Sequence, residues 1–261
     1  MIDSKNQSTA INPNISDFTI NKYQELLVLA KKNYNFVSYQ NINFNQKFVL
    51  WRHDCDFSLN RALKLAELEK RENIVTTYFI NLHCEFYNLF EREQSEIIRK
   101  IINLGHNIGI HFDINYYNVK SEEDLKKWLI FEKNIFIKLF NIKPIVFSFH
   151  NPNLFSLSFE KKKYTGLINC YSKQFKNNVG YISDSNGYWR FKRLSDVLSL
   201  AKEKNIQVLT HPAWWQDVIS SPYDRIQRCV KGRAKNILNN YNEQLKKDGR
   251  INFGKEKSKD R

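Results

Sequence analysis

Glycine and proline are scarce in this 261-residue chain, with eight and five residues. So few of both exclude a collagen-like repeat, and the high aromatic content argues against a disordered chain. Methionine occurs once, and the four cysteines (Cys55, Cys84, Cys170 and Cys229) form no Cys-x-x-Cys pair. This pattern indicates reduced thiols in a cytoplasmic protein rather than a disulfide framework.

Long apolar runs are missing as well. No stretch approaches the roughly 18 apolar residues that a membrane-spanning helix needs, and residues 1–17 lack the basic and then apolar pattern of a secretory signal. We expect a flexible N-terminus (1–17), one large domain (18–230) and a basic C-terminal helix or tail (231–261). The expected location is the cytoplasm.

Acidic residues are outnumbered by basic ones. The chain has 27 acidic and 41 basic residues, and its net charge is +14. Basic surfaces attract phosphates, but here the excess is spread over lysine-rich helix faces and the tail. No zinc-finger, helix-turn-helix or RNA-binding signature accompanies it. We expect no specific nucleic-acid partner. The charge suits solubility, a phosphorylated substrate, or peripheral contact of the basic C-terminus with an anionic membrane.

Helical and strand-like patterns alternate along the chain, which predicts one α/β domain with a mostly parallel sheet, open or closed into a barrel. Apolar spacing predicts helices at 20–33, 58–72, 91–104, 121–140, 194–204 and 225–247. Short β-branched and aromatic runs predict strands at 75–80, 107–111, 145–149, 167–170, 180–183 and 206–210, after an opening strand that begins at Phe48.

The opening strand starts as an apolar run and ends in the polar segment Arg52–Asp56. Ligands of α/β folds bind beyond the carboxyl ends of parallel strands. On a strand, Asp54 and Asp56 point to the same face, so their charges repel unless a cation or a proton lies between them. The alternative is a strand end that merely caps the next helix.

Five of the six histidines follow the carboxyl end of a predicted strand. In a parallel sheet they would converge with the acids at the same strand ends. Imidazole and carboxylate groups are the ligands of zinc and related divalent metals, and a catalytic site uses three protein ligands with open positions. For any single histidine, a structural hydrogen bond is the alternative. The histidines are His53, His83, His111, His150 and His211, and the acids are Asp54, Asp56, Asp113 and Asp184.

Four segments, in order, resemble the polysaccharide deacetylase superfamily, the NodB homology group of carbohydrate esterase 4-like enzymes. They are Arg52–Asp56, Gly105–Asp113, Asp184–Trp189 and Leu209–Pro212. The resemblance covers roughly Val49 to Trp215. It implies a distorted (β/α) barrel of about seven parallel strands, a divalent metal of the zinc type held by one Asp and two His, and hydrolysis of an N-acyl group on a sugar.

The resemblance also implies roles for single residues. Asp54 corresponds to the catalytic base and Asp56 to the metal-binding acid. His111 matches the first ligand histidine, and His211 matches the histidine that protonates the leaving amine. Asp184 and Trp189 stand where the family supports that histidine and lines the pocket.

The chain departs from the family pattern at the second ligand histidine, because that position holds Asn115. His83 is the leading candidate for the third ligand, followed by Asp113 and His150. The family's arginine-and-proline motif is replaced by Phe149–Pro152, and Arg52 is a candidate for the missing positive charge beside Asp54. The expected substrate-binding residues are Arg52, His150, Asp184, Trp189 and Trp214.

The resulting hypothesis is a metal-dependent hydrolase that removes an acetyl or formyl group from a sugar. Without a secretory signal, a nucleotide- or lipid-linked sugar of surface polysaccharide biosynthesis is the expected substrate. Three alternatives stay open: a catalytically inactive carbohydrate-binding barrel, a scaffold that uses the basic tail at a membrane, and a hydrolase of another bond, such as an ester or a formamide, with the same metal chemistry.

Overall fold

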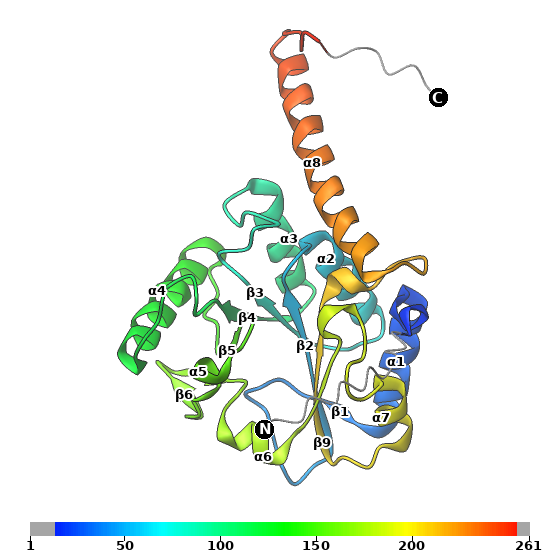
Figure 1. Ribbon diagram of the computed structural model, residues 1–261, viewed down its shortest axis with the longest axis vertical. Helices are drawn as coiled ribbons and strands as arrows, with labels where there is room; N and C mark the ends of the chain where they lie inside the picture. Colours follow the sequence, from blue (N-terminus) through cyan, green and yellow to red (C-terminus); the bar gives the residue numbers. More distant parts are fainter. Residues whose placement is uncertain (1–13, 255–261) are drawn as a thin grey trace, which may run out of the picture.

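In the computed structural model, which describes residues 14–254, a curled and mainly parallel sheet runs through the molecule with helices arranged around it (Figure 1). The strand order is β6-β7-β5-β4-β3-β2-β9-β8, and β1 pairs with β2. Every pairing is parallel except that of β6 with β7. The strands are β1 (Asn35–Phe36), β2 (Phe48–Cys55), β3 (Thr77–Ile80), β4 (Asn107–Phe112), β5 (Val146–Phe149), β6 (Lys163–Tyr164), β7 (Leu167–Asn169), β8 (Gly180–Ser183) and β9 (Asn205–Thr210).

The expected distorted (β/α) barrel is confirmed, with the strands from β7 round to β8 all parallel. Within residues 14–254, the edge strands of the sheet are β6, on the outer side of β7, and β8. These two do not pair with each other, so the barrel wall is open between them. The α-helices are α1 (Ile20–Asn33), α2 (Leu59–Arg71), α3 (Arg92–Asn103), α4 (Glu122–Phe140), α5 (Leu154–Leu157), α6 (Lys173–Asn178), α7 (Leu194–Leu200) and α8 (Pro222–Lys247). Short 3-10 helices are η1 (Ile15–Phe18), η2 (Ser185–Gly187) and η3 (Pro212–Trp214).

Strand β2 is buried along its whole length, and its side chains alternate between two environments. Phe48 and Leu50 belong to the apolar cluster inside the barrel. Val49 and Trp51 pack outward against α1 and its neighbours. Side chains of a strand alternate between its two faces, and Asp54 is an even number of residues from Phe48 and Leu50. Its carboxylate therefore points to the inside of the barrel.

Side chains cap four of the predicted helices, α1, α2, α4 and α8. Ser58 accepts a hydrogen bond from the backbone N–H of Arg61 at the start of α2, and Ser121 accepts one from Asp124 at the start of α4. The predicted helix 194–204 is too long, because α7 ends at Leu200, where Ala201 adopts a left-handed backbone with φ 45°. The short elements β1, β6, α5 and α6 were not predicted.

Helix α8 runs without a break through the predicted domain boundary at residue 230 and extends away from the barrel (Figure 1). Of the predicted flexible N-terminus, residues 1–13 lie outside the described part, while Asp17 in η1 is buried and ion-paired with Arg193. The domain division stays a prediction. Among the described residues, no helix is both long and apolar enough to span a membrane.

Candidate metal centre

The end of β2 presents a buried ion pair. The Arg52 guanidinium is fully buried and donates from Nη2 to Asp54 Oδ2 at 2.7 Å and to the Tyr171 hydroxyl at 3.1 Å. Asp54 Oδ1 is buried and has no hydrogen-bond partner among the described residues. The ion pair therefore fixes one oxygen of Asp54 and leaves the other available to a ligand.

Asp56, His111 and His150 gather beside this pair. One ligand-type atom from each lies within 4.8 Å of the others. His111 Nε2 is 3.0 Å and His150 Nδ1 is 3.4 Å from Asp56 Oδ1. That oxygen is buried without a hydrogen-bond partner in the described part of the chain. A buried, unpartnered oxygen facing two ring nitrogens matches a shared divalent cation, so these residues fit the metal that the family resemblance implies.

The surroundings orient this donor set. In the pairing of β4 with β5, His111 lies opposite Ser148, and its Nδ1 is 2.7 Å from the Ser148 hydroxyl. This contact holds the ring so that Nε2 faces Asp56, as the partners of metal-bound histidines do. Burial by itself raises the pKa of Asp56, but His111, His150 and His211 together hold it well below its usual range. The carboxylate is therefore ionised and able to bind a cation.

His211 stands on the other side of Asp56, with Nε2 3.5 Å from Asp56 Oδ2. Its Nδ1 is 2.6 Å from Asp184 Oδ1, and its backbone N–H donates to the same carboxylate. Burial lowers the pKa of His211, but the charge and hydrogen bond of Asp184 outweigh burial and raise it to about 9. His211 is thus an imidazolium at neutral pH, with Nδ1 held and Nε2 directed toward the site.

A cavity of about 380 Å³ opens over these side chains and is lined by Asp54, Asp56, His111 and His211. The segment after β8 contributes Arg190, Phe191 and Lys192 to its lining. The Phe191 ring is 88% exposed. The cavity therefore joins the acids and imidazoles at its base to two cations and a flat aromatic side chain.

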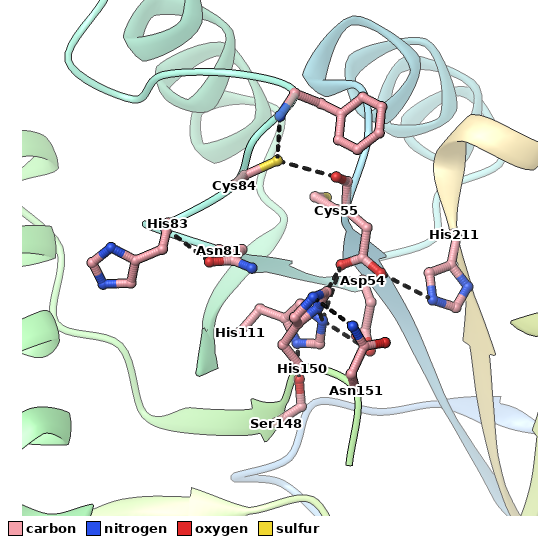
Figure 2. Close-up of polar contacts among 12 residues, drawn as sticks. Asp54, Cys55, Asn81, His83, Cys84, His111, Ser148, His150, Asn151 and His211 are labelled. Carbon is pink, nitrogen blue, oxygen red and sulfur yellow. Dashed lines mark hydrogen bonds and ion pairs between the residues drawn. The ribbon is translucent and has the colours of Figure 1, made fainter. Parts of the chain in front are cut away.

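His83, the leading candidate for the third ligand, lies apart from Asp56 and His111, whereas His150, a later candidate, lies beside them. After β3, Asn81 Oδ1 accepts the backbone N–H of His83 at 2.8 Å and turns the chain aside. His83 then stacks on Tyr116 with ring centroids 3.5 Å apart, and its Nε2 is 2.7 Å from the Tyr117 hydroxyl. Figure 2 shows Asp54, His111, His150 and His211 directed toward one another and His83 set apart from them.

Three further candidates also lie outside the donor set. His53 precedes Asp54 on β2 and therefore faces the opposite side, where its Nε2 is 2.6 Å from Glu69 Oε1. Asp113 accepts the backbone N–H groups of Asn115 and Tyr116 and so closes a turn. Asn115 is exposed. The expectation that all five strand-end histidines converge is therefore corrected to three of them, His111, His150 and His211.

The aromatic residues predicted to bind substrate are buried instead. Trp189 stacks on Phe18 with ring centroids 5.2 Å apart, and Trp214 packs on Phe57 at 5.1 Å. Their exposed fractions are 8% and 4%, and neither lines the cavity. Arg52 is likewise too buried to meet a substrate directly. Asp184 acts on the site through His211.

The sequence analysis did not identify Ser148, Tyr171 or the segment Arg190–Lys192. Ser148 precedes His150 by two residues, and the alternation of a strand would have placed both on one face. No comparable signal marks Tyr171, because its contact with Arg52 joins residues 119 positions apart. The rim segment follows a predicted strand end, but its direction depends on the path of the loop.

Comparison with known proteins gives structural similarity at low sequence identity. No family model matches the chain, and no curated protein does. Among solved structures, the peptidoglycan deacetylase PdaC from Bacillus subtilis gives a TM-score of 0.42 at 12% identity over 79% of this chain and 99% of that one. The chitin deacetylase from Colletotrichum lindemuthianum gives 0.40 at 14% identity, with 76% and 86% covered. A CE4 family pseudoenzyme from Bacillus anthracis gives 0.40 at 14% identity, with 74% and 63% covered. Because the similar structures include both enzymes and a pseudoenzyme, the function of this chain rests on its own side chains.

Proposed function

We propose that this protein is a metal-dependent hydrolase that removes an N-acyl group, acetyl or formyl in the simplest case, from a sugar. One observation carries the proposal. The donor set of Asp56, His111 and His150 lies beside Asp54, which has a free oxygen, and beside His211, which is held by Asp184. Of these residues, Asp54, Asp56, His111 and His211 line one cavity. A ligand set, a base and an acid are the parts that amide hydrolysis requires.

Zinc is the metal we propose, because two imidazoles and one carboxylate are a common catalytic zinc set with room for further ligands. When bound, such an ion polarises the amide carbonyl and lowers the pKa of water toward about 7. The metal would be held by Asp56 Oδ1, His111 Nε2 and His150 Nδ1, which are the atoms that face one another here.

The protein's own residues move the protons. Asp54, through its unpartnered Oδ1, takes the proton of the attacking water, while Arg52 holds the other oxygen in place. His211 gives its Nε2 proton to the sugar nitrogen as the C–N bond breaks, and Asp184 keeps the ring oriented through Nδ1. The products are a carboxylic acid and a free amine on the sugar.

The rim of the cavity supports a sugar carried on a phosphate, as in a nucleotide- or lipid-linked precursor of a surface polysaccharide. Arg190 and Lys192 supply positive charge there, and the exposed Phe191 ring offers a face to a sugar. Lys192 is also ion-paired with Glu203 at 3.1 Å, which leaves Arg190 as the stronger candidate for the phosphate. A cytoplasmic location is part of the proposal, supported by the free state of all four cysteines, each of which lies in the described part.

The proposed function is tested by comparing His150→Ala with His83→Ala. Wild-type protein loaded with zinc is expected to release acetate or formate from N-acylated amino sugars, and activity should disappear with a chelator and return with zinc. His150→Ala should bind zinc at least tenfold more weakly and lose activity, since it removes a ligand atom. His83→Ala should keep both, measured by metal titration and by a free-amine assay.

The outcomes separate the alternatives. Zinc binding without hydrolysis of any amide would indicate an inactive barrel, and hydrolysis of sugar esters alone would assign the centre to a different bond. Loss of zinc in His83→Ala but not in His150→Ala would reject this ligand set.

Helix α8 supports the proposed contact with an anionic membrane. Along α8, only Arg225 is fully buried, and Val230, Ile237 and Tyr241 are each at least half exposed on one side of the helix. Lysine and arginine outnumber aspartate and glutamate along it. An exposed apolar stripe on a helix rich in lysine and arginine is typical of helices that lie in an anionic lipid surface. A second copy of this helix would carry the same positive charge and repel it.

Vesicle sedimentation tests this contact with the full chain. Wild-type protein is expected to bind phosphatidylserine-rich vesicles at least tenfold more tightly than phosphatidylcholine vesicles, and less tightly as salt rises. Replacing Ile237 with aspartate should remove most of this binding. Leu200→Asp, at an exposed apolar site on α7, is the matched control and should bind like the wild type. Equal binding by both variants would reject α8 as the contact.

A further inference from the structure

A second cavity of about 420 Å³ lies beside α6, the helix that connects β7 to β8. We name it the seam cavity. Its apolar lining includes Leu157 of α5, Cys170 after β7, Phe175 of α6 and Val179 before β8. Cys170, Phe175 and Val179 also belong to the apolar cluster inside the barrel, so the cavity reaches into the core.

Two polar side chains of the seam cavity, Lys176 and Gln207, already have hydrogen-bond partners in the protein. Lys176 Nζ donates to the Leu157 carbonyl at 2.6 Å and is ion-paired with Glu160 at 2.8 Å. Gln207 Oε1 accepts the Tyr39 hydroxyl at 3.0 Å. A sugar hydroxyl entering here would displace existing hydrogen bonds, whereas a hydrocarbon would not. The chemistry of the lining therefore favours an alkyl chain.

The seam cavity adjoins the metal centre. Pro152, Tyr171 and Tyr181 line both cavities. The Tyr171 hydroxyl accepts the hydrogen bond from Arg52, which is the residue that holds Asp54. A substrate whose carbonyl lies beside Asp54 thus has the seam cavity next to it, on the far side of the two tyrosines.

We propose that the seam cavity takes the alkyl chain of N-acyl groups longer than acetyl, so that the protein accepts fatty N-acyl sugars. This inference rests on the proposed function and extends its range of acyl groups. The sugar lies at the rim beside Arg190, the amide at Asp54 and His211, and the chain in the seam cavity. Water cleaves the C–N bond, and the products are a fatty carboxylate and the amino sugar.

The first experiment measures hydrolysis of N-acetylglucosamine and N-octanoylglucosamine by the zinc-loaded protein. Their acyl chains have two and eight carbons. Burying one CH₂ group is worth about fourfold in binding, so kcat/KM for octanoyl should exceed that for acetyl by at least tenfold. Val179→Phe narrows the seam cavity and should lower the octanoyl value at least tenfold while the acetyl value stays within threefold. Val218→Phe, the same substitution at a 70% exposed position, should change neither.

The second experiment does not depend on hydrolysis. In calorimetry, octanoate is expected to bind at least tenfold more tightly than acetate, and Val179→Phe should remove that difference. If Val179→Phe does not fold, Leu157→Trp at a partly exposed position makes the same comparison. Suppose the protein hydrolyses the amide, but neither variant changes the preference for the longer acyl chain or the binding of octanoate. That result would reject the seam cavity as the acyl-chain site and leave the proposed function standing. Octanoate binding that depends on position 179, in a protein that hydrolyses no amide, would overturn the proposed function and support the seam cavity.

Discussion

Replacing Asp54 with asparagine is expected to lower kcat by about 10²- to 10⁴-fold, the usual contribution of a general base. The amide has the same shape as the carboxylate, and its oxygen can still accept from Arg52 Nη2, so the fold should be kept. What is lost is the ability of Oδ1, which has no hydrogen-bond partner within residues 14–254, to take a proton. The measurement is turnover of an N-acylated amino sugar at saturating zinc.

Zinc content must be measured alongside, because Asp54 Oδ2 is 3.7 Å from His111 Nε2. Asp113→Asn is the matched control, since this neighbouring acid caps a turn through backbone N–H groups that an amide oxygen can also accept. It should stay within twofold of the wild type. Near-normal kcat in Asp54→Asn would remove Asp54 as the base, and loss of zinc in that variant would make it a ligand instead.

Replacing Glu69 with glutamine is expected to lower the free energy of unfolding by about 3 kcal/mol, because charged buried hydrogen bonds contribute about 1.5–3 kcal/mol each. The Glu69 carboxylate is fully buried and close to His53 Nε2 at 2.6 Å. It also accepts from the hydroxyls of Tyr23, Tyr78 and Thr76. An amide keeps one accepting oxygen and turns an N–H₂ group toward these donors. Urea denaturation measures the loss.

The pH dependence of this loss has a defined sign. Burial raises the pKa of Glu69, but His53, His106 and Tyr23 outweigh burial and lower it below the usual value. A lowered native pKa stabilises the fold above the unfolded pKa of about 4.3, and this stabilisation disappears as the pH falls through the native value. The difference between wild type and Glu69→Gln should therefore shrink below about pH 4. Glu67→Gln, at an exposed position of the same helix, should stay within about 0.5 kcal/mol throughout.

The sequence predicted the longer elements well, because their signals are local. Ser58 and Ser121 are caps followed by apolar residues at helical spacing, and α2 and α4 begin directly after them. The two-residue strands β1 and β6 carry no periodicity of their own and depend on their partners. Helix α7 ends at a left-handed alanine, which no local rule predicts.

The sequence predicted which residues lie near the site but not the direction in which each side chain points. Position after a strand placed Asp56, His111, His150 and His211 near one edge of the sheet, and the structure brings them together. The position of His83 after a strand did not reveal that Asn81 turns the chain so that His83 points away from the site. Such turns depend on contacts between loops, and the same holds for Trp189 and Trp214, whose burial results from packing against distant residues.

Neighbouring residues of strand β2 serve both the stability of the fold and the proposed chemistry. His53 faces Glu69 on the helix side, and Asp54, one residue later, faces the cavity. A slip of one residue against β9 would exchange these two neighbours, placing a carboxylate among the donors around Glu69 and an imidazole where the base should be. An insertion or deletion of one residue between Phe48 and Asp54 would therefore damage both folding and the proposed catalysis.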